Sequence, residues 1–252
     1  MKLDSGNFRD AATPAGDTRT DALLGAMQKL GYQVANVAER DVRLGYTEFV
    51  ERTAEVKIEF ISANLIREDT KAQLFKPHLL LEAVSADGET KRRVGVIGVV
   101  RGNPMFRESG PDDSVMVIDD PVTRVRAEVE ILRSQDVDAI IVLAALHKFD
   151  ARKILEQVDG IDFVLGSHGD TVTPRPERYG DGWIMYGGNR GSRIVEARMF
   201  LDGRAQDFAR VHYLSNSYSF DPEMLEYVNS IYNKTEPVAA EENVICEPGA
   251  GS

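Results

Sequence analysis

The sequence predicts an α/β domain in which two β-sheets pack face to face and helices cover their outer sides. Two observations favour this fold class. A strand–helix–strand unit spans residues 138–165, and its strands are apolar enough to be buried on both faces, as in a parallel sheet. Antiparallel patterns stand on either side of this unit, around Asp87-Gly88 and around Asp202-Gly203. A chain that combines both kinds of pairing is expected to build mixed sheets.

The first third of the chain predicts short strands that alternate with helices. Met1–Leu3 is typical of the end of a strand, and after a polar loop Asp17 or Thr18 can cap a helix. Apolar residues recur at helical spacing up to Leu30, and Gly31 is in the usual position for ending a helix. The next expected elements are a strand at Val34–Val37, a helix near Glu48 and a strand at Glu59–Ser62.

The middle of the chain carries the clearest pattern. Two β-rich runs flank Asp87-Gly88 and predict a hairpin, and Asp120 before Pro121 indicates the start of a helix that ends near Ser134. Another helix is expected at Asp150–Val158. The strands expected at the centre of the fold, because their apolar character is uninterrupted, are Arg93–Val100, Asp138–Leu143 and Asp162–Leu165.

The last third predicts an antiparallel meander and a final helix. The expected strands are Trp183–Tyr186, Arg193–Leu201 and Gln206–Tyr213, joined by tight turns. Asp221-Pro222 can open a helix that runs to about Tyr232. With no internal repeat and no credible linker before this point, the sequence predicts one domain over residues 1–234 and a flexible tail over residues 235–252.

The composition limits the classes of function. The net charge is −11 and no Lys/Arg-rich run occurs, so a nucleic-acid backbone would meet a repulsive surface. Cys246 is the only cysteine, which excludes an internal disulfide and a CxxC metal or redox motif. Neither a signal-peptide-like stretch nor a membrane-length apolar segment is present, so the sequence as written predicts a cytoplasmic protein without membrane contact.

Several stretches, in this order, resemble the calcineurin-like metallophosphoesterase domain of the 5′-nucleotidase family. They are LDSGNF, LGYQVANVAERDVRLG, FISANL, KPHLLLEAV, RRVGVIGVV, VDAIIVLAALHKFD and GIDFVLGSHGDTV. The first is similar to the family's Asp-x-Gly-Asp turn, the second to its Gly-Asn-His-Glu block and the last to its Gly-His-x-His strand end. The resemblance extends nearly to the final helix and implies a four-layer αββα sandwich of two mixed β-sheets.

The resemblance also implies a two-metal site, and this chain departs from it at most ligand positions. Such a site clamps two divalent metals so that a metal-bound hydroxide can attack phosphorus. The bridging carboxylate of the family corresponds to Asn7, its metal-binding Asn to Glu39, and its acid-donating His to Arg40. A further ligand His corresponds to Ala145, and the first motif, Asp-x-His, would precede Leu3 and is not in this sequence.

Four matching positions keep an atom that can bind a metal. The resulting candidate metal ligands are Asn7, Glu39, His168 and Asp170. A remodelled or single-metal site built from them would take Mn²⁺, Mg²⁺, Zn²⁺ or Co²⁺, and His147 is a substitute ligand for the position of Ala145. For His168 and Asp170 a purely structural loop is an equally good interpretation.

The candidate anion-binding residues are Arg40, Asn189 and Arg190. An arginine stays protonated, so Arg40 cannot act as a general acid but can hold a phosphate. Asn189 and Arg190 lie in a glycine-rich turn whose backbone N–H groups can cradle an anion, although the turn also fits a structural role. Glu39, Arg40 and Asp41 also fit a solvated charged turn. Because the candidates follow different strands, we expect Asn7, Glu39, Arg40, His168 and Asp170 to converge on one rim.

The sequence leaves two functions open. One is a degenerate metallophosphoesterase-like domain that lacks two-metal catalysis and binds a small phosphorylated ligand or a protein partner. The other is a metal-dependent phosphoric ester hydrolase with a remodelled or single-metal site. Two-metal chemistry needs about six or seven protein ligands, more than this chain offers, which favours the first function. A serine hydrolase is disfavoured because no GxSxG motif occurs. Family relatives are often exported, so the cytoplasmic prediction holds only for the sequence as written.

Overall fold

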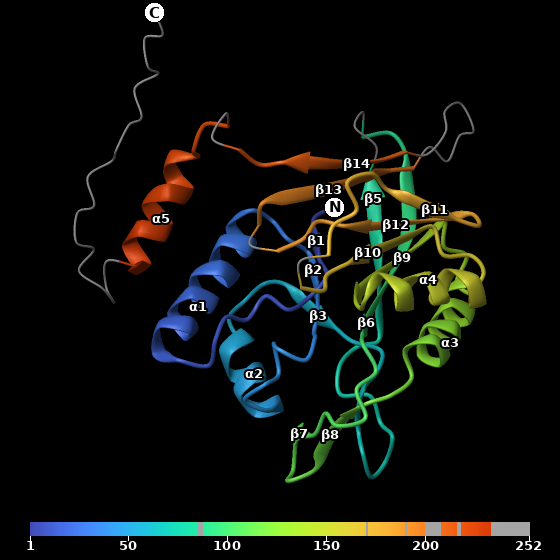
Figure 1. Ribbon diagram of the computed structural model, residues 1–252, viewed down its shortest axis with the longest axis horizontal. Helices are drawn as coiled ribbons and strands as arrows, with labels where there is room; N and C mark the ends of the chain where they lie inside the picture. Colours follow the sequence, from blue (N-terminus) through green and yellow to red (C-terminus); the bar gives the residue numbers. More distant parts are fainter. Residues whose placement is uncertain (85–87, 170, 190, 200–207, 216–217, 233–252) are drawn as a thin grey trace, which may run out of the picture.

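A six-stranded mixed sheet forms the centre of the molecule (Figure 1). The computed structural model describes residues 1–84, 88–169, 171–189, 191–199, 208–215 and 218–232. In spatial order its strands are β11 (Glu177–Tyr179), β12 (Gly182–Tyr186), β10 (Phe163–Gly166), β9 (Ala139–Ala145), β6 (Lys91–Val100) and β5 (His78–Val84). The four inner strands run parallel to one another, and the two edge strands are antiparallel to their neighbours. The prediction that β6, β9 and β10 lie near the centre is therefore confirmed.

Two helices cover one face of this sheet. They are α3 (Pro121–Arg133) and α4 (Lys148–Gln157), the crossovers that join β6 to β9 and β9 to β10. The Asp120 carboxylate caps α3 by accepting a hydrogen bond from the backbone N–H of Thr123 at 2.7 Å. Every residue of β9 is buried, as expected for a strand covered on both faces. The main apolar core lies between these helices and the sheet.

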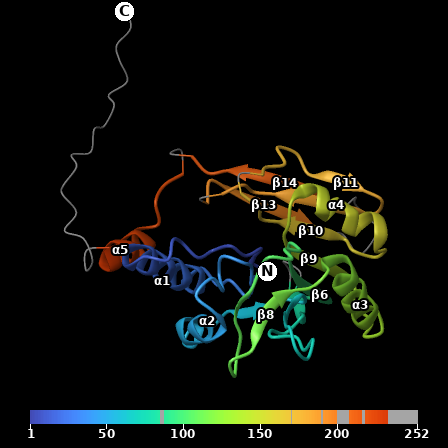
Figure 2. The same cartoon turned by 60° about the horizontal axis from the view of Figure 1, so that its bottom comes forward.

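A second layer of strands packs on the opposite face. It consists of the parallel strands β1 (Leu3–Asp4), β2 (Val34–Asn36) and β3 (Glu59–Ile61). The helices α1 (Pro14–Lys29) and α2 (Tyr46–Thr53) lie outside this layer, on the side of the molecule away from α3 (Figure 2). The order helix, sheet, sheet, helix agrees with the predicted α/β sandwich.

Two smaller sheets and one helix complete the described structure. The strands β4 (Leu65–Arg67), β7 (Glu108–Ser109) and β8 (Val115–Ile118) form one small sheet, and β13 (Arg193–Arg198) and β14 (Phe208–Tyr213) form an antiparallel pair. Val195 and Ala209 of this pair pack with the core that faces β1–β3. The last helix, α5 (Pro222–Tyr232), lies beside α1 in both views. The second strand layer is thus divided into separate sheets.

Two predictions about secondary structure were wrong in detail. β12 does not form a meander with β13, because it pairs in parallel with β10 and antiparallel with β11. Its residues are mostly buried, so it belongs inside the large sheet and not in a half-exposed hairpin. The helix expected from Asp17 or Thr18 begins at Pro14, where the Thr13 hydroxyl caps it by accepting from the N–H of Gly16 at 3.1 Å.

The predicted tail, residues 235–252, and the expected strand ends at Leu201 and Gln206 lie outside the described residues. Of the helices that the structure describes, none combines the length and the hydropathy needed to cross a lipid bilayer.

Candidate functional site

A cavity of about 220 Å³ opens where the carboxyl ends of several strands meet. It is lined by Asn7, Glu39, Arg40, Val100, Arg101, Ala145, His168 and Gly169. These residues stand at the ends of β6 and β9 or in the loops after β1, β2 and β10. The structure therefore brings together Asn7, Glu39, Arg40 and His168, which the sequence analysis expected on one rim.

The loop that carries Asn7 is fixed by hydrogen bonds to β10 of the large sheet and to the loop that follows β10. The Ser5 hydroxyl donates to the carbonyl of Leu165 at 2.8 Å, and the Ser167 hydroxyl donates to the carbonyl of Gly6 at 2.7 Å. Asn7 itself has a φ of 66°, the left-handed region that asparagine tolerates better than most residues. The backbone on both sides of Asn7 is thereby held against the strand that leads to His168.

Asp41 joins this loop to the loop after β2. Its carboxylate is 1% exposed and accepts hydrogen bonds from the backbone N–H groups of Asn7 at 2.8 Å, Arg9 at 3.0 Å and Ala38 at 2.9 Å. Burial raises the pKa of Asp41 to about 7, although the three N–H bonds act in the opposite direction. The hypothesis of a solvated charged turn is therefore wrong for Asp41, whereas Arg40 is exposed.

One carboxylate oxygen of Glu39 is hydrogen-bonded to another side chain of the same chain. Its Oε1 accepts a hydrogen bond from the side-chain amide of Asn103 at 2.9 Å. Arg40, the next residue, lines the same cavity, and its guanidinium lies near enough to Asp10 to help lower the pKa of that carboxyl. Among the described lining residues Glu39 is thus the one carboxylate, with one of its two oxygens hydrogen-bonded, and it lies beside the cation Arg40.

Arg101, His147 and His168 form a connected group at the cavity. Arg101 Nη1 lies 3.3 Å from Nε2 of His147, and the imidazole ring centres of His147 and His168 are 3.6 Å apart. Burial lowers the pKa of His168, and the nearby His147 and Arg101 lower it further. At neutral pH this imidazole is therefore neutral and the positive charge of the cavity comes from its arginines.

This set of residues does not fit a two-metal centre. Asn7 supplies a neutral amide in place of a bridging carboxylate, Ala145 supplies a methyl group, and two guanidinium groups line the cavity. Within the part of the chain that the structure describes, no group of three or more His, Cys, Asp or Glu side chains is placed to hold a metal ion. Among the described lining residues, one carboxylate stands beside two guanidinium groups, which is too little negative charge to hold two dications together.

The structure does not test two of the remaining candidates and places the third outside the cavity. Asp170 and Arg190 lie outside the described residues. Asn189 is exposed in its turn and is not among the residues that line the cavity. The function expected for these positions stays a prediction.

Two residues of the site were missed by the sequence analysis. Arg101 directly follows the buried strand β6, and the general rule that ligand sites gather at the carboxyl ends of strands would have placed it on the rim. Asp41 was considered only as part of a charged turn. Its role depends on backbone N–H groups from two loops, which side-chain identity does not reveal.

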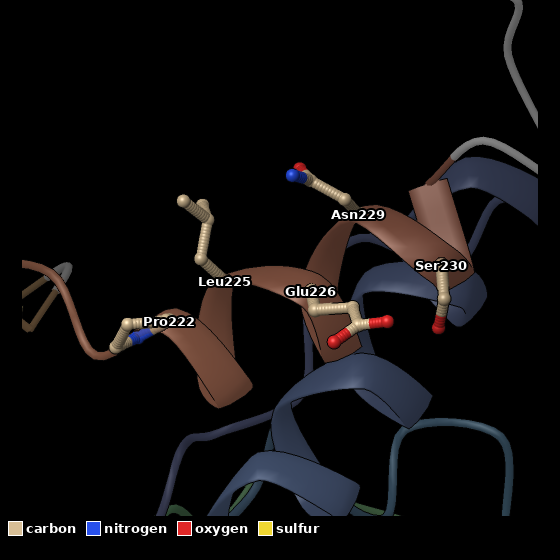
Figure 3. A pocket seen from close by; sticks show the side chains of 5 residues that line it. All are labelled: Pro222, Leu225, Glu226, Asn229 and Ser230. Atoms are coloured by element: carbon tan, nitrogen blue, oxygen red, sulfur yellow. The ribbon is translucent and has the colours of Figure 1, made fainter.

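Another depression, of about 460 Å³, lies on α5. Figure 3 shows its lining residues Pro222, Leu225, Glu226, Asn229 and Ser230, with Leu225 and Asn229 pointing away from α1. All five come from one helix, so within the described residues no second element brings converging chemistry to this surface. The cavity at the strand ends is therefore the better candidate for a functional site.

No protein-family model matches the chain. A 2′,3′-cyclic-nucleotide 2′-phosphodiesterase/3′-nucleotidase of Salmonella typhimurium is 24% identical over 161 residues, which are 59% of this chain and 25% of that protein. A 5′-nucleotidase of Diplobatis ommata is 27% identical over 195 residues, 75% of this chain and 30% of the relative. The chain thus spans less than a third of the length of these curated relatives.

Solved structures show the same fold. The sulfate thiohydrolase SoxB of Thermus thermophilus superposes with a TM-score of 0.77 at 20% identity, over 92% of this chain and 42% of that one. The calcineurin-like phosphoesterase YfkN of Bacillus subtilis gives a TM-score of 0.73 at 14% identity, over 92% and 82% of the two chains. The metallophosphoesterase fold that the sequence motifs implied is confirmed.

Proposed function

We propose that this chain, which has the metallophosphoesterase fold and 5′-nucleotidases among its homologues, binds a small phosphorylated or otherwise anionic ligand without two-metal hydrolysis. The ligand occupies the cavity at the strand ends. The single observation that carries the proposal is the pair of guanidinium groups, Arg40 and Arg101, in a cavity whose described lining holds one carboxylate, Glu39, which accepts a hydrogen bond from Asn103.

Charge supports an anion over a cation at this position. The whole chain carries a net charge of −11, so the two arginines form a local exception on an acidic molecule. Guanidinium groups remain charged at every physiological pH and match the geometry of phosphate oxygens. Asn7 adds a side-chain amide that can donate to an anion as readily as it can accept from a cation.

The chemistry of hydrolysis is disfavoured by the same residues. Arg40 cannot donate a proton to a leaving oxygen, and Ala145 offers no lone pair. The competing function, a remodelled single-metal hydrolase, would use Glu39 and His168, which line the same cavity, together with Asp170, which lies outside the described residues.

A titration of the full chain with inorganic phosphate tests the proposal. We expect saturable binding, with the largest changes in amide NMR signals at Asn7, Val100 and Gly169, because their backbones border the cavity. Arg40→Ala should weaken this binding by about tenfold. Arg43→Ala, a change of the same charge at an exposed position outside the cavity lining, is the control. Absence of phosphate binding, or signal changes confined to another surface, would contradict the proposal.

A further inference from the structure

Arg101 differs from Arg40 in that the protein fixes its position. The backbone N–H of Arg101 donates to the carbonyl of Ala145 at 3.0 Å, which joins the ends of the central strands β6 and β9. Its Nη1 lies 3.3 Å from Nε2 of His147, so one side of the guanidinium is directed at that imidazole. A preorganised guanidinium loses less conformational entropy when it binds a ligand.

The opposite edge of the Arg101 guanidinium has no protein acceptor. Its Nε is buried and unpaired within the part of the chain that the structure describes, and no carboxylate pairs with Nη2 there. A buried N–H that lacks an acceptor is costly, so an incoming acceptor atom gains more at this position than at an exposed one. The edge formed by Nε and Nη2 is also the one that can bind two oxygens of a single phosphate or carboxylate.

The lining of the cavity limits what else the ligand can use. Among the described residues that line it, His168 supplies the one aromatic ring, and no Phe, Tyr or Trp offers a larger stacking surface for a nucleobase. Its volume of about 220 Å³ suits a phosphoryl group with a small substituent better than a whole nucleotide. Recognition inside the cavity therefore depends on the oxyanion.

We propose that Arg101 determines the specificity of the cavity by binding two oxygens of a tetrahedral phosphoryl group through its Nε–Nη2 edge. His147 is a positioning residue that keeps the other edge of the guanidinium turned away. This inference rests on the proposed anion-binding function and adds the ligand class and the residue that selects it. The phosphoryl group belongs either to free phosphate or to a phosphate monoester, because both present the same oxygens.

Calorimetric titration of the full chain with inorganic phosphate, phenyl phosphate and chloride tests this role. The wild type should bind both phosphates and discriminate against chloride. Arg101→Lys keeps the charge but loses the two-point contact, so phosphate affinity should fall by about tenfold or more while chloride affinity stays unchanged. Arg92→Lys, at the other end of β6, is the matched control and should bind as the wild type does.

The two phosphates distinguish the sources of the ligand. Tighter binding of phenyl phosphate, with the same dependence on Arg101, supports a monoester as the ligand. Equal binding supports recognition of the phosphoryl group alone. His147→Gln keeps an acceptor near the position of Nε2 and should retain the affinity for phosphate. His147→Ala should lower that affinity several-fold. Wild-type affinity in His147→Ala would overturn the positioning role.

The binding results distinguish an incorrect role for Arg101 from an absence of anion binding. If Arg101→Lys binds phosphate as tightly as the wild type while Arg40→Ala does not, the role of Arg101 is overturned and anion binding stands. If the wild type binds neither phosphate compound, both proposals are overturned. Thermal unfolding of each variant shows whether a loss of binding reflects a loss of fold.

Discussion

Three residues change the chemistry of the site for separate physical reasons. Asn7 lacks the negative charge that holds two dications together against their mutual repulsion, and Ala145 has no lone pair. Arg40 cannot donate a proton to the leaving group. General acid catalysis of this kind commonly contributes about a hundredfold to ten-thousandfold in rate. In the proposed function, the cavity that these residues line holds an oxyanion and does not activate water.

At the residue scale, Asp41 is expected to be the main support of the cavity. Replacing Asp41 with alanine removes the acceptor for the backbone N–H groups of Asn7, Arg9 and Ala38. We expect the free energy of unfolding at pH 7.5 to fall by about 3 kcal/mol, since buried donors would remain unsatisfied. Urea denaturation measures this loss, and Glu55→Ala, at an exposed position, is the control. A change equal to that of the control would contradict the supporting role.

The pKa values of two buried carboxyls predict an unusual dependence of stability on pH. Burial raises the pKa of Asp4 to about 6 and that of Asp41 to about 7, from about 4 in an unfolded chain. Between pH 4 and these values the folded state holds more protons than the unfolded state, so stability falls as pH rises and levels off above pH 7. The lowered pKa of His168 opposes this fall up to about pH 6.5, whereas carboxylates with a lowered pKa, such as Asp69, act in the opposite sense only in more acidic solution.

Unfolding free energies measured at constant ionic strength between pH 5 and pH 7.5 test this dependence. We expect the wild type to lose about 3 kcal/mol over this range, and Asp4→Asn to lose about 1 kcal/mol less. Stability that stays constant or increases toward pH 7.5 would show that these carboxyls are charged in the folded state at pH 5.

The sequence could predict which residues share the site but only part of what each one does. Asn7, Glu39, Arg40 and His168 were found because each follows a strand with a recognisable motif. The orientation of the Arg101 guanidinium depends on His147, which is far from it in the chain. Such long-range pairing leaves no local pattern, so it became visible only in the folded structure.

At the element scale, Gly98 in β6 marks the closest approach of the two strand layers. A Cβ atom at Gly98 would lie 2.6 Å from Oδ1 of Asn36 and 2.7 Å from the carbonyl oxygen of Ile61. Gly98→Ala should therefore destabilise the protein by about 2 kcal/mol, because β2 and β3 would have to move. At Gly102 the nearest atom to an added Cβ, in Pro121, is 3.6 Å away, so Gly102→Ala is the matched control for the same denaturation experiment. Equal stability of the two variants would argue against this tight packing.

Strand order was predictable where burial and connection agreed, and not where they conflicted. The strands β6, β9 and β10 have uninterrupted apolar sequences and are joined by helices, so their parallel pairing followed from the sequence. The connection from β10 to β12 contains β11 and no helix. The short turns near β12 suggested a hairpin, but its buried residues required a place inside the large sheet.

At the scale of the whole molecule, the cavity is a positive site on an acidic protein. The net charge of −11 opposes the approach of any anion from a distance, whereas Arg40 and Arg101 attract it at short range. Salt screens the long-range repulsion over about 10 Å at 0.1 M and affects short, partly buried contacts less. The layered fold places all five contributing strand ends on the same side, which is why these arginines meet in one cavity.

The central claim is that the described site holds an anion and not two metals. Metal content measured on the purified full chain after incubation with Mn²⁺, Mg²⁺, Zn²⁺ and Co²⁺, together with hydrolysis of an aryl phosphate, tests this most directly. We expect no tightly bound pair of metals and no metal-dependent turnover above background. Two bound metals per chain, with turnover that His168→Ala abolishes, would contradict the claim and support a rebuilt hydrolytic site.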